Sequence, residues 1–224
     1  MRSTWDYAAR LGEFLAWAER IDPVLLHGSA VFGWNTDKSY LLDLAAAGVP
    51  VVPTRLASSE AEVRELLGDG SWVVKPTVGA NGLGVSSVEG AGWIPDSAGP
   101  WVVQPLVESV RTEGETSVFV IGAAVVAQLS KSPAAGEFRV QEERGGRTRP
   151  VPVTDEARDL ADQAYAATER LLGTSLSYAR IDLLRHDGHL VVTEVEVTEP
   201  GPYLDVLPGI AEPFADVLAR RLLP

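Results

Sequence analysis

The chain has 224 residues, of which 46% are hydrophobic, so it can bury a substantial core as one large domain or two smaller lobes. Its formal net charge of −12 argues against nucleic acid as a partner, because that binding draws on a positive electrostatic field. A single nucleotide is not excluded, since it needs only a few basic groups placed locally. The absence of cysteine excludes a disulfide framework, a thiol nucleophile and a cysteine-ligated metal.

The sequence also lacks the usual signals for export or membrane insertion. The N-terminal residues, MRSTWDYAARLGEF, have no apolar core of the kind found in signal peptides. The longest apolar run, from Val118 to Leu129, is too short to span a membrane and is interrupted at Gly122. We therefore expect a cytoplasmic protein with no membrane partner.

The first half of the chain predicts helices followed by strands. Residues 6–20 have helical spacing, whereas residues 21–34 contain glycine and proline and are expected to be irregular. A helix is expected to begin at the N-cap Thr36 and to end at Gly48. The further elements expected here are a short strand at 49–52, a helix at 59–67, strands at 71–76 and 85–88, and a loop at 90–100.

The second half predicts strands and two helices. A helix is expected from the N-cap Thr154 to Leu172, and an amphipathic helix from Gly209 to Leu223 closes the chain. The remaining elements expected here are a strand at 101–106, a polar loop at 108–114, a hairpin of 115–121 with 124–130, a strand at 137–141 and a turn rich in arginine and glycine at 142–149.

Residues 178–201 read as two strands joined by a tight turn at the Asp-Gly pair 187–188. The loop length decides which side chains share a face, because a one-residue slip in register moves every side chain across the sheet. A two-residue turn leaves Glu194 and Glu196 on the face opposite to Asp182. A three-residue loop places all three carboxylates on one face and the apolar residues on the other, so we expect the three-residue loop.

In that register one face carries Arg180 beside Asp182, Glu194 and Glu196. Three carboxylates this close raise one another's pKa and cannot all stay ionised without compensating positive charge. A hard divalent cation such as Mg²⁺ is the usual compensation for a cluster of oxygen ligands, and Arg180 adds a fixed positive charge. The alternative is a solvated hairpin face whose charges have no function.

Lys75 ends an apolar strand and is followed by a glycine-rich loop that contains Gly79, Gly82 and Gly84. Backbone N–H groups that are not shielded by side chains can cradle phosphates. The loop lacks the Gly-Lys-Ser/Thr ending of a Walker A sequence, and a strand rather than a helix follows it, unlike a dinucleotide fingerprint. Taken alone, such a loop is more often a tight hairpin that binds no ligand.

Other polar residues could bind a nucleotide, although each could equally be an ordinary surface charge or a residue at a strand edge with no binding function. Lys38 is expected in the first turn of its helix, where the macrodipole disfavours a cation, so a bound anion could hold it there. Glu115 could accept hydrogen bonds from hydroxyl groups, and Arg139 could hold a carboxylate or a phosphate. A hinge between lobes is expected where a strand meets a loop, at Gln104, Pro105, Leu106 and Val107.

The order of these parts resembles the ATP-grasp superfamily, which includes D-alanine–D-alanine ligase, glutathione synthetase and biotin carboxylase. The resemblance runs from about Asn35 to the C-terminus and implies an α+β fold in which two lobes grip a nucleotide. It implies that two lysines contact the phosphates of ATP, that the glycine loop closes over them, that the hinge meets the adenine and that an acid binds the ribose. The residues implied are Lys38, Lys75, Gly79, Gly82, Gly84, Gln104, Pro105, Leu106, Val107 and Glu115.

The resemblance also assigns the charged face of the hairpin. Arg180 matches the family's phosphate-facing arginine, and Asp182, Glu194 and Glu196 match the ligands of two Mg²⁺ ions. The family commonly has asparagine where Glu196 stands, and we expect the site to tolerate the added negative charge. Arg139 is the candidate for orienting the acyl phosphate or the substrate carboxylate.

The resemblance divides the chain into a small lobe at 36–106 and a C-terminal lobe at 107–224. The family usually carries a Rossmann-like domain before the grasp. Residues 1–35, which begin with the sequence RSTWDY after Met1, look like a remnant of that domain or a linker. We therefore expect an N-terminally short form.

The activity implied is that of an ATP- and Mg²⁺-dependent ligase, with Mn²⁺ as an alternative ion, that joins a carboxylate to an amine. The carboxylate would attack the γ-phosphate to give an acyl phosphate, which the amine then displaces. Such phosphoryl transfer depends mostly on positioning and charge neutralisation. The expected partners are small amino-acid-like carboxylate and amine substrates, and a homodimer is compatible with the sequence. Two alternatives stay open, a nucleotide-binding module without catalysis and a phosphotransferase that releases no amide.

Overall fold

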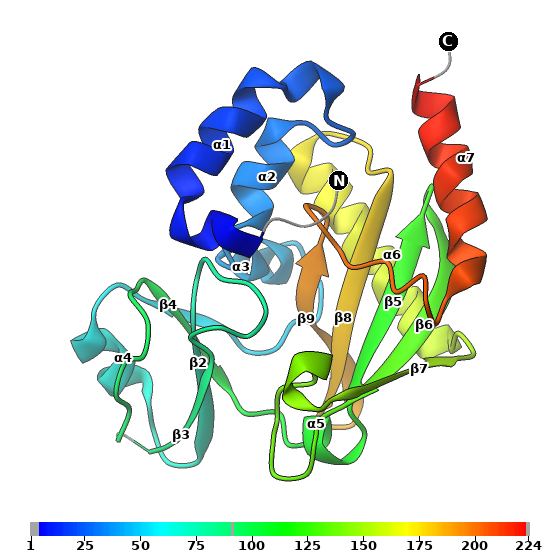
Figure 1. Ribbon diagram of the computed structural model, residues 1–224. Coiled ribbons are helices and arrows are strands. Elements are labelled where there is room, and N and C mark those ends of the chain that lie inside the picture. Colours follow the sequence, from blue (N-terminus) through cyan, green and yellow to red (C-terminus); the bar gives the residue numbers. More distant parts are fainter. Residues whose placement is uncertain (1–4, 91, 223–224) are drawn as a thin grey trace.

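The computed structural model describes residues 5–90 and 92–222. Residues 2–4 of the RSTWDY segment and Leu223, the expected end of the last helix, lie outside the described residues. The chain forms two α+β lobes, each built on an antiparallel sheet, and the N-terminal helices pack beside the larger lobe (Figure 1). The expected fold class is therefore confirmed. None of the helices in the described ranges is long and apolar enough to cross a membrane.

The smaller lobe is a four-stranded sheet with the strand order β1-β4-β2-β3. Its core contains Val74, Trp93, Trp101 and Val103, and α4 packs against it through Val63. The bounds are β1 Arg55–Ala57, α4 Glu60–Leu66, β2 Ser71–Pro76, β3 Ser86–Glu89 and β4 Trp101–Pro105. The strands expected at 71–76, 85–88 and 101–106 and the helix expected at 59–67 are confirmed to within one residue at each end.

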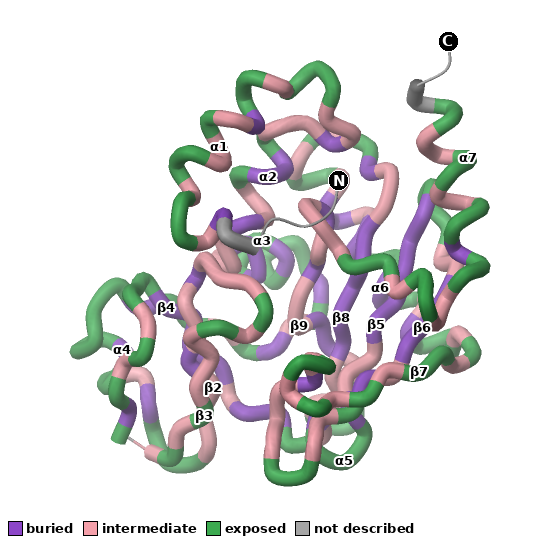
Figure 2. Tube along the Cα trace, viewed as in Figure 1, coloured by how far each residue is buried: buried purple, intermediate pink, exposed green. Residues whose placement is uncertain are grey.

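The larger lobe is a five-stranded sheet with the order β7-β6-β5-β8-β9. Side chains alternate along its central strands, so Val118 and Val120 face α6 while Phe119 and Ile121 face the side on which α7 packs. Figure 2 shows β5 and β8 as the most continuously buried strands of this sheet. The bounds are β5 Glu115–Ile121, β6 Ala124–Ser132, β7 Arg147–Val151, α6 Asp155–Leu172, β8 Tyr178–His186, β9 His189–Glu196, η4 Pro208–Ile210 and α7 Ala211–Leu222.

The N-terminal segment is more helical than the sequence predicted. The helix expected at 6–20 is a 3-10 turn followed by an α-helix, and the segment expected to be irregular contains a further helix, α2. A glycine within a helix costs only about 1 kcal/mol, and burial of Val31 and Phe32 offsets that cost. The bounds are η1 Trp5–Ala9, α1 Leu11–Arg20, η2 Asp22–Val24, α2 Ser29–Asn35 and α3 Tyr40–Ala46.

The expected helix start at Thr36 is wrong. Thr36 follows the last residue of α2, and its hydroxyl donates a hydrogen bond to the Phe32 carbonyl at 2.8 Å. The N-cap of α3 is Ser39, so α3 starts at Tyr40, later than the sequence indicated. The prediction failed because a threonine hydroxyl has two local options. It can accept a hydrogen bond from the first turn of the following helix as an N-cap, or donate one to a carbonyl in the last turn of the preceding helix.

Three other expectations are corrected. The strand expected at 49–52 is reduced to one parallel bridge between Val51 and Val192, and the residues of the strand expected at 137–141 belong to neither sheet. The polar loop at 108–114 contains the one-turn helix α5, Ser109–Thr112. The turn at 142–149 comprises η3, Glu142–Arg144, and the start of β7. Short strands and single turns carry too little periodic signal to be read from sequence.

The β8–β9 hairpin has the expected residue pairs, but a two-residue turn and a bulge produce them, not a three-residue loop. Asp187 and Gly188 form a two-residue turn with positive φ angles of 49° and 84°, so the three-residue loop is wrong. A bulge then leaves Thr193 as an extra residue, and the register moves by one. Asp182 therefore pairs with Glu194 and Arg180 with Glu196, as expected.

The turn provides a test of this geometry. Gly188→Ala should lower the free energy of unfolding by about 1 kcal/mol, because an alanine side chain is strained at a φ of +84° even though no atom would meet its Cβ. Gly12→Ala is the matched control, since Gly12 lies on the exposed side of α1 and its Cβ would also meet nothing. There alanine should stabilise by about 0.5–1 kcal/mol. Urea unfolding of both variants checks the opposite signs, and equal effects would contradict the assigned turn.

Candidate active site

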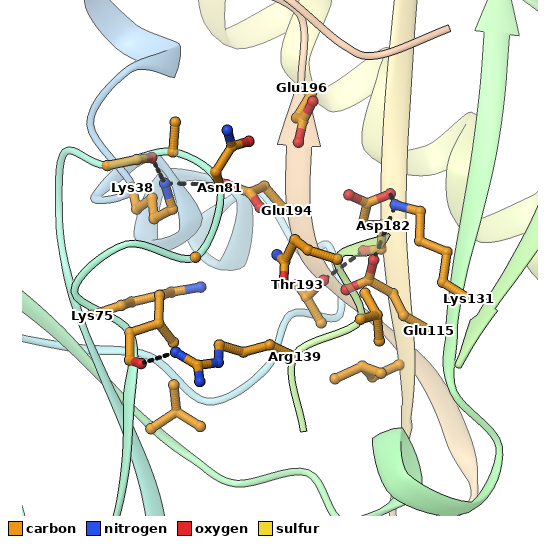
Figure 3. Close-up of a pocket in the computed structure, with 18 of the residues that line it drawn as sticks. Lys38, Lys75, Asn81, Glu115, Lys131, Arg139, Asp182, Thr193, Glu194 and Glu196 are labelled. Atoms are coloured by element: carbon orange, nitrogen blue, oxygen red, sulfur yellow. Dashed lines mark hydrogen bonds and ion pairs between the residues drawn. The ribbon is translucent and has the colours of Figure 1, made fainter. Parts of the chain in front are cut away.

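A cleft of about 430 Å³ lies between the two lobes, and it collects nearly all of the residues singled out from the sequence. The cleft is lined by β2, the glycine-rich loop and the end of β4 on one side and by β5, β6, β8 and β9 on the other. Among the residues expected to serve a nucleotide or a metal, Gly84 alone does not line it. The arrangement in Figure 3 therefore brings together side chains from distant parts of the sequence.

The three expected metal ligands lie together at the floor of the cleft. Asp182 comes from β8, and Glu194 and Glu196 come from β9, so that each residue offers an oxygen atom within 4.8 Å of the other two. Asp182 is only 2% exposed, and the two glutamates are partly exposed towards the cleft. The cluster can exist because the bulge at Thr193 returns both glutamates to the face that carries Asp182.

Arg180 holds this cluster together. Its Nε lies 3.0 Å from Asp182 Oδ1, its Nη2 lies 2.8 Å from Asp182 Oδ2, and Nη2 also donates to Glu196. Burial alone would raise the pKa of Asp182, but the guanidinium and the nearby Lys131 ammonium hold it well below its usual range. Burial, together with the charges of Asp182 and Glu194, raises the pKa of Glu196 to about 8.

Lys131 is a functional candidate that sequence reasoning missed. Its Nζ lies 3.3 Å from Glu115 Oε1 and 3.6 Å from Asp182 Oδ1, and its side chain is 5% exposed. A regular hairpin would pair Glu115 with Ser130, but a bulge near Val126 shifts the register so that Glu115 faces Lys131. The sequence could have indicated Lys131 only if the bulge had been predicted, because the bulge places this lysine opposite Glu115, the acid predicted to bind the ribose.

The two lysines of the phosphate prediction have different surroundings. Lys38 lies in the turn before α3, not in its first helical turn, so the macrodipole argument does not apply. Its Nζ donates to the Gly79 carbonyl at 2.8 Å and lies 3.2 Å from Glu194 Oε1. The Lys75 side chain makes no hydrogen bond or ion pair within the described ranges, and burial lowers its pKa to about 8.

The glycine-rich loop is held by arginines of the larger lobe. Arg139 donates to the Val85 carbonyl at 3.3 Å, and Arg144 donates to the Gly82 carbonyl at 3.4 Å. The Arg139 guanidinium also pairs with Glu137 at 2.7 Å, and Figure 3 shows it on the Lys75 side of the cleft, away from Asp182. In this state Arg139 connects the lobes and does not reach the carboxylate cluster.

The hinge and Glu115 lie where the sequence placed them. Leu106 N donates to the Ser71 carbonyl at 2.9 Å, which fixes the chain as it leaves β4. Gln104 is buried, and its Nε2 donates to the Thr54 hydroxyl at 2.8 Å. Burial, with the charge of Asp182, raises the pKa of Glu115 to about 7. The hinge residues that line the cleft are Gln104, Pro105, Leu106 and Val107.

Two models of known protein families match this chain. A family model described as the RimK-like ATP-grasp domain matches residues 36–202. A second model, described as the N-terminal domain of the D-cycloserine synthetase DcsG, matches residues 1–27, within the segment that the sequence marked as a remnant or linker.

Individual relatives support the same placement. The cycloserine biosynthesis protein DcsG of Streptomyces lavendulae is 33% identical over 254 aligned positions, which cover 100% of this chain and 82% of that protein. A probable α-L-glutamate ligase of Aliivibrio salmonicida (strain LFI1238) is 33% identical over 175 positions, which cover 72% of this chain and 54% of that protein. The chain thus spans about half the length of that ligase.

Solved structures show the same fold. The crystal structure of D-cycloserine synthetase DcsG has a TM-score of 0.86 and 31% identity over 99% of this chain and 82% of that chain. D-alanine–D-alanine ligase from Bacillus anthracis has a TM-score of 0.63 and 18% identity over 87% of this chain and 69% of that chain. The chain belongs to the RimK-like ATP-grasp family and is an ATP-grasp carboxylate–amine ligase, as the resemblance implied.

Lys75 supplies a testable consequence. Its folded-state pKa of about 8 lies below the ordinary value of 10.5, so at pH 7 the protein bears the full cost of burying an ammonium group. That cost falls as pH rises from about 8 to 10.5, where the folded state releases the proton before the unfolded state does. Lys75→Met should therefore raise the free energy of unfolding at pH 7 by on the order of 1–3 kcal/mol, with less gain at pH 10.

Denaturant unfolding at the two pH values measures this difference. Lys75→Arg is the control, because it keeps a positive charge that does not titrate in this range and should remove the pH dependence without the gain. A Lys75→Met variant that is less stable than the native chain at both pH values would contradict a lysine held at an energetic cost for a ligand.

Proposed function

We propose that this chain uses ATP to activate a substrate carboxylate as an acyl phosphate and then joins the acyl group to an amine, with two divalent cations bound. The observation that carries the proposal is the cluster of Asp182, Glu194 and Glu196 in one cleft with Lys38 and Arg180. Carboxylate oxygens suit Mg²⁺ and Mn²⁺, and the basic side chains suit phosphate oxygens. The substrates are small amino-acid-like molecules.

The charge of the cleft supports two cations. Seven carboxylates and five basic side chains line it, so it has a negative formal charge before any ligand binds. ATP adds further negative charge. The five basic side chains are too few to offset both the carboxylates of the cleft and the phosphates of ATP. Two divalent cations would restore the balance, and the oxygen atoms of the cluster lie within 4.8 Å of one another, close enough to share ions.

The residues take distinct parts in the proposed reaction. Asp182, Glu194 and Glu196 would hold Mg²⁺, which would supply positive charge against the charge that develops during phosphoryl transfer. Lys75 and Lys38 offset charge on the phosphates from the side of the smaller lobe, and Arg180 offsets it from the larger lobe. A carboxylate oxygen of the substrate forms a bond to the γ-phosphorus as the bond to ADP breaks. The amine nitrogen then forms a bond to the acyl carbon, phosphate leaves and the amine gives up a proton.

We infer the direction in which ATP lies from the order of the proposed binding residues along the cleft. The hinge at 104–107 precedes α5 at one end of β8 and β9, and Lys38, Lys75 and Gly79 also line the cleft. Figure 3 shows Thr193, Glu194 and Glu196 in succession along β9 away from that end. The adenine would meet the hinge, the ribose would meet Glu115, and the γ-phosphate would lie near Glu196.

The substrate class rests on the named relatives. A D-cycloserine synthetase, α-L-glutamate ligases and a D-alanine–D-alanine ligase all have names that refer to amino acids or their derivatives. We therefore propose amino acids and their derivatives as both the carboxylate and the amine.

Thermal unfolding with and without Mg²⁺–ATP tests the proposed site. Ligand at one hundred times its dissociation constant adds about 2.7 kcal/mol, a shift on the order of 5–10 °C for a chain of this size. The native chain should show that shift only when Mg²⁺ and ATP are both present. Glu194→Gln should lose most of it, because the variant removes one charged oxygen ligand.

Glu65→Gln is the matched control, since Glu65 is an exposed residue of α4 that does not line the cleft and makes no ion pair within the described ranges. It should keep the full shift. A native chain that ATP stabilises equally well without divalent cations would contradict the metal assignment. A shift that Glu194→Gln retains in full would contradict the role of that carboxylate.

A further inference from the structure

The segment between β9 and α7, residues 197–210, crosses over the larger sheet and carries a tyrosine that no motif assigns (Figure 1). Tyr203 lines the cleft, and the centroid of its ring lies 5.3 Å from Lys131 Nζ on β6 and 5.9 Å from the guanidinium carbon of Arg180 on β8. The ring also meets Phe119 of β5 edge to face, with 6.3 Å between the ring centroids. Contacts with three neighbouring strands, two of them cation–π contacts, therefore fix the ring.

The backbone holds Tyr203 in a conformation that few side chains adopt. Its φ angle is +49°, in the left-handed region, where a bulky residue other than glycine is strained. Val206 N and Leu207 N donate hydrogen bonds to the Tyr203 carbonyl at 3.1 Å and 2.8 Å, which stabilises the turn. Strain of this kind persists only where the surrounding structure enforces it, and it is frequent at binding sites. Tyr203 is therefore a fixed feature of the cleft and a candidate for contact with a ligand.

Gly201 leaves a space open beside that ring. The residue lines the cleft, and its φ angle lies outside the left-handed region. Pro202 disfavours the helical region for the residue before it, and the extended conformations that remain are open to alanine as well. The backbone therefore does not require glycine here. A Cβ atom would have Tyr203 Cε2 at 3.7 Å and Arg180 Nη1 at 3.8 Å as its nearest neighbours, so at least one carbon atom fits between the ring and the guanidinium.

The guanidinium of Arg180 has one nitrogen atom left for a ligand. Nε donates to Asp182, and Nη2 donates to Asp182 and Glu196. Nη1 donates no hydrogen bond within the part of the chain that the structure describes, and it faces the space at Gly201. Arginine nitrogens bind the oxygen atoms of carboxylates and phosphates. The space thus combines a donor for an oxygen anion with an aromatic wall for carbon atoms.

This space lies at the end of the cleft away from the hinge. Leu184 of β8 packs against the cluster that contains Val107 of the hinge. Asp182 and Arg180 precede Leu184 at every second position, and all three line the cleft. Because a strand rises about 3.3 Å per residue, Arg180 lies about 13 Å from Leu184. With the base at the hinge and the phosphates beside Asp182, the substrate carboxylate would lie next to Arg180.

We propose that Gly201 and Tyr203 form, beside Arg180, a subsite that holds the substrate next to its reacting carboxylate, and that the ring of Tyr203 limits the size of the group bound there. The inference rests on the proposed function and extends it to substrate selectivity. The space favours small amino acids, because a larger side chain meets a ring that its contacts with Lys131, Arg180 and Phe119 hold in place.

Thermal unfolding with saturating Mg²⁺ and the ATP analogue AMPPNP measures this subsite. The probes are alanine and serine as small amino acids and leucine and phenylalanine as large ones, each as both enantiomers. Affinities follow from the dependence of the added shift on the amino-acid concentration. At least one small amino acid should raise the unfolding temperature of the native chain further and should bind at least tenfold more tightly than either large one.

Two variants should change the subsite in opposite directions. Tyr203→Ala removes the ring and should improve the binding of leucine or phenylalanine, relative to the small amino acid, tenfold or more. Gly201→Ala fills the space and should weaken the small amino acid at least tenfold. Tyr203→Phe keeps the ring and should keep the native selectivity. A loss of stability cannot improve the binding of a larger ligand, so that gain separates recognition from folding.

Each variant has a matched control outside the cleft. Phe214→Ala removes a ring of α7 from the apolar cluster against which Tyr203 also packs, and Phe214 does not line the cleft. Gly209→Ala adds a methyl group at an exposed position where no atom lies within 4 Å of the new Cβ. Both controls should keep the native order of affinities.

The outcomes separate this inference from the proposed function. If Mg²⁺ with AMPPNP does not stabilise the native chain, the proposed function fails and this inference fails with it. If it does, but no small amino acid adds to the shift or the large ones bind equally well, the subsite alone is wrong. The subsite is also wrong if Tyr203→Ala keeps the native preference. It is wrong as well if Gly201→Ala reduces the shift with Mg²⁺ and AMPPNP alone, because the space would then hold a phosphate oxygen of the nucleotide.

Discussion

The site depends on one interaction, the contact of Arg180 with Asp182 and Glu196. Three carboxylates with oxygen atoms within 4.8 Å of one another would repel strongly, and burial would add to the cost. Arg180 and Lys131 on the larger lobe, and Lys38 beside Glu194, supply positive charge that offsets the repulsion between these acids. The same basic groups are the ones that phosphate oxygens would use.

A second constraint ties the N-terminal segment to that site. His27 Nδ1 lies 2.8 Å from the Val197 carbonyl, and its Nε2 accepts a hydrogen bond from Ser177 N at 2.9 Å. Asn35 fixes the backbone around Glu196, and Tyr7 reaches the cleft itself. The residues that the sequence marked as a remnant or linker thus pack against the larger lobe at the end of β9. Two described residues of this segment, Tyr7 and Asn35, line the cleft.

The fold class, the family and most strands could be predicted because apolar alternation and the order of the charged motifs survive local irregularity. What could not be predicted are the features set by single bulges. Thr193 and the irregularity near Val126 each move a register by one residue, and no local pattern marks them. The pairing of Asp182 with Glu194 was predicted because polar and apolar side chains should occupy opposite faces of the hairpin. The pairing is confirmed, although the predicted three-residue loop is wrong. Lys131 was missed for the same reason, because its partner is set by the other bulge.

The most direct test of the account is to count the divalent cations that the site holds. Electron paramagnetic resonance of free Mn²⁺, titrated with the chain and AMPPNP, measures binding without any substrate or turnover. The account predicts two Mn²⁺ ions per chain when the nucleotide is present, weak binding when it is absent, and loss of affinity in Asp182→Asn. Binding that does not depend on the nucleotide, or that Asp182→Asn leaves unchanged, would contradict the claim that the cluster of Asp182, Glu194 and Glu196 is the metal–nucleotide centre.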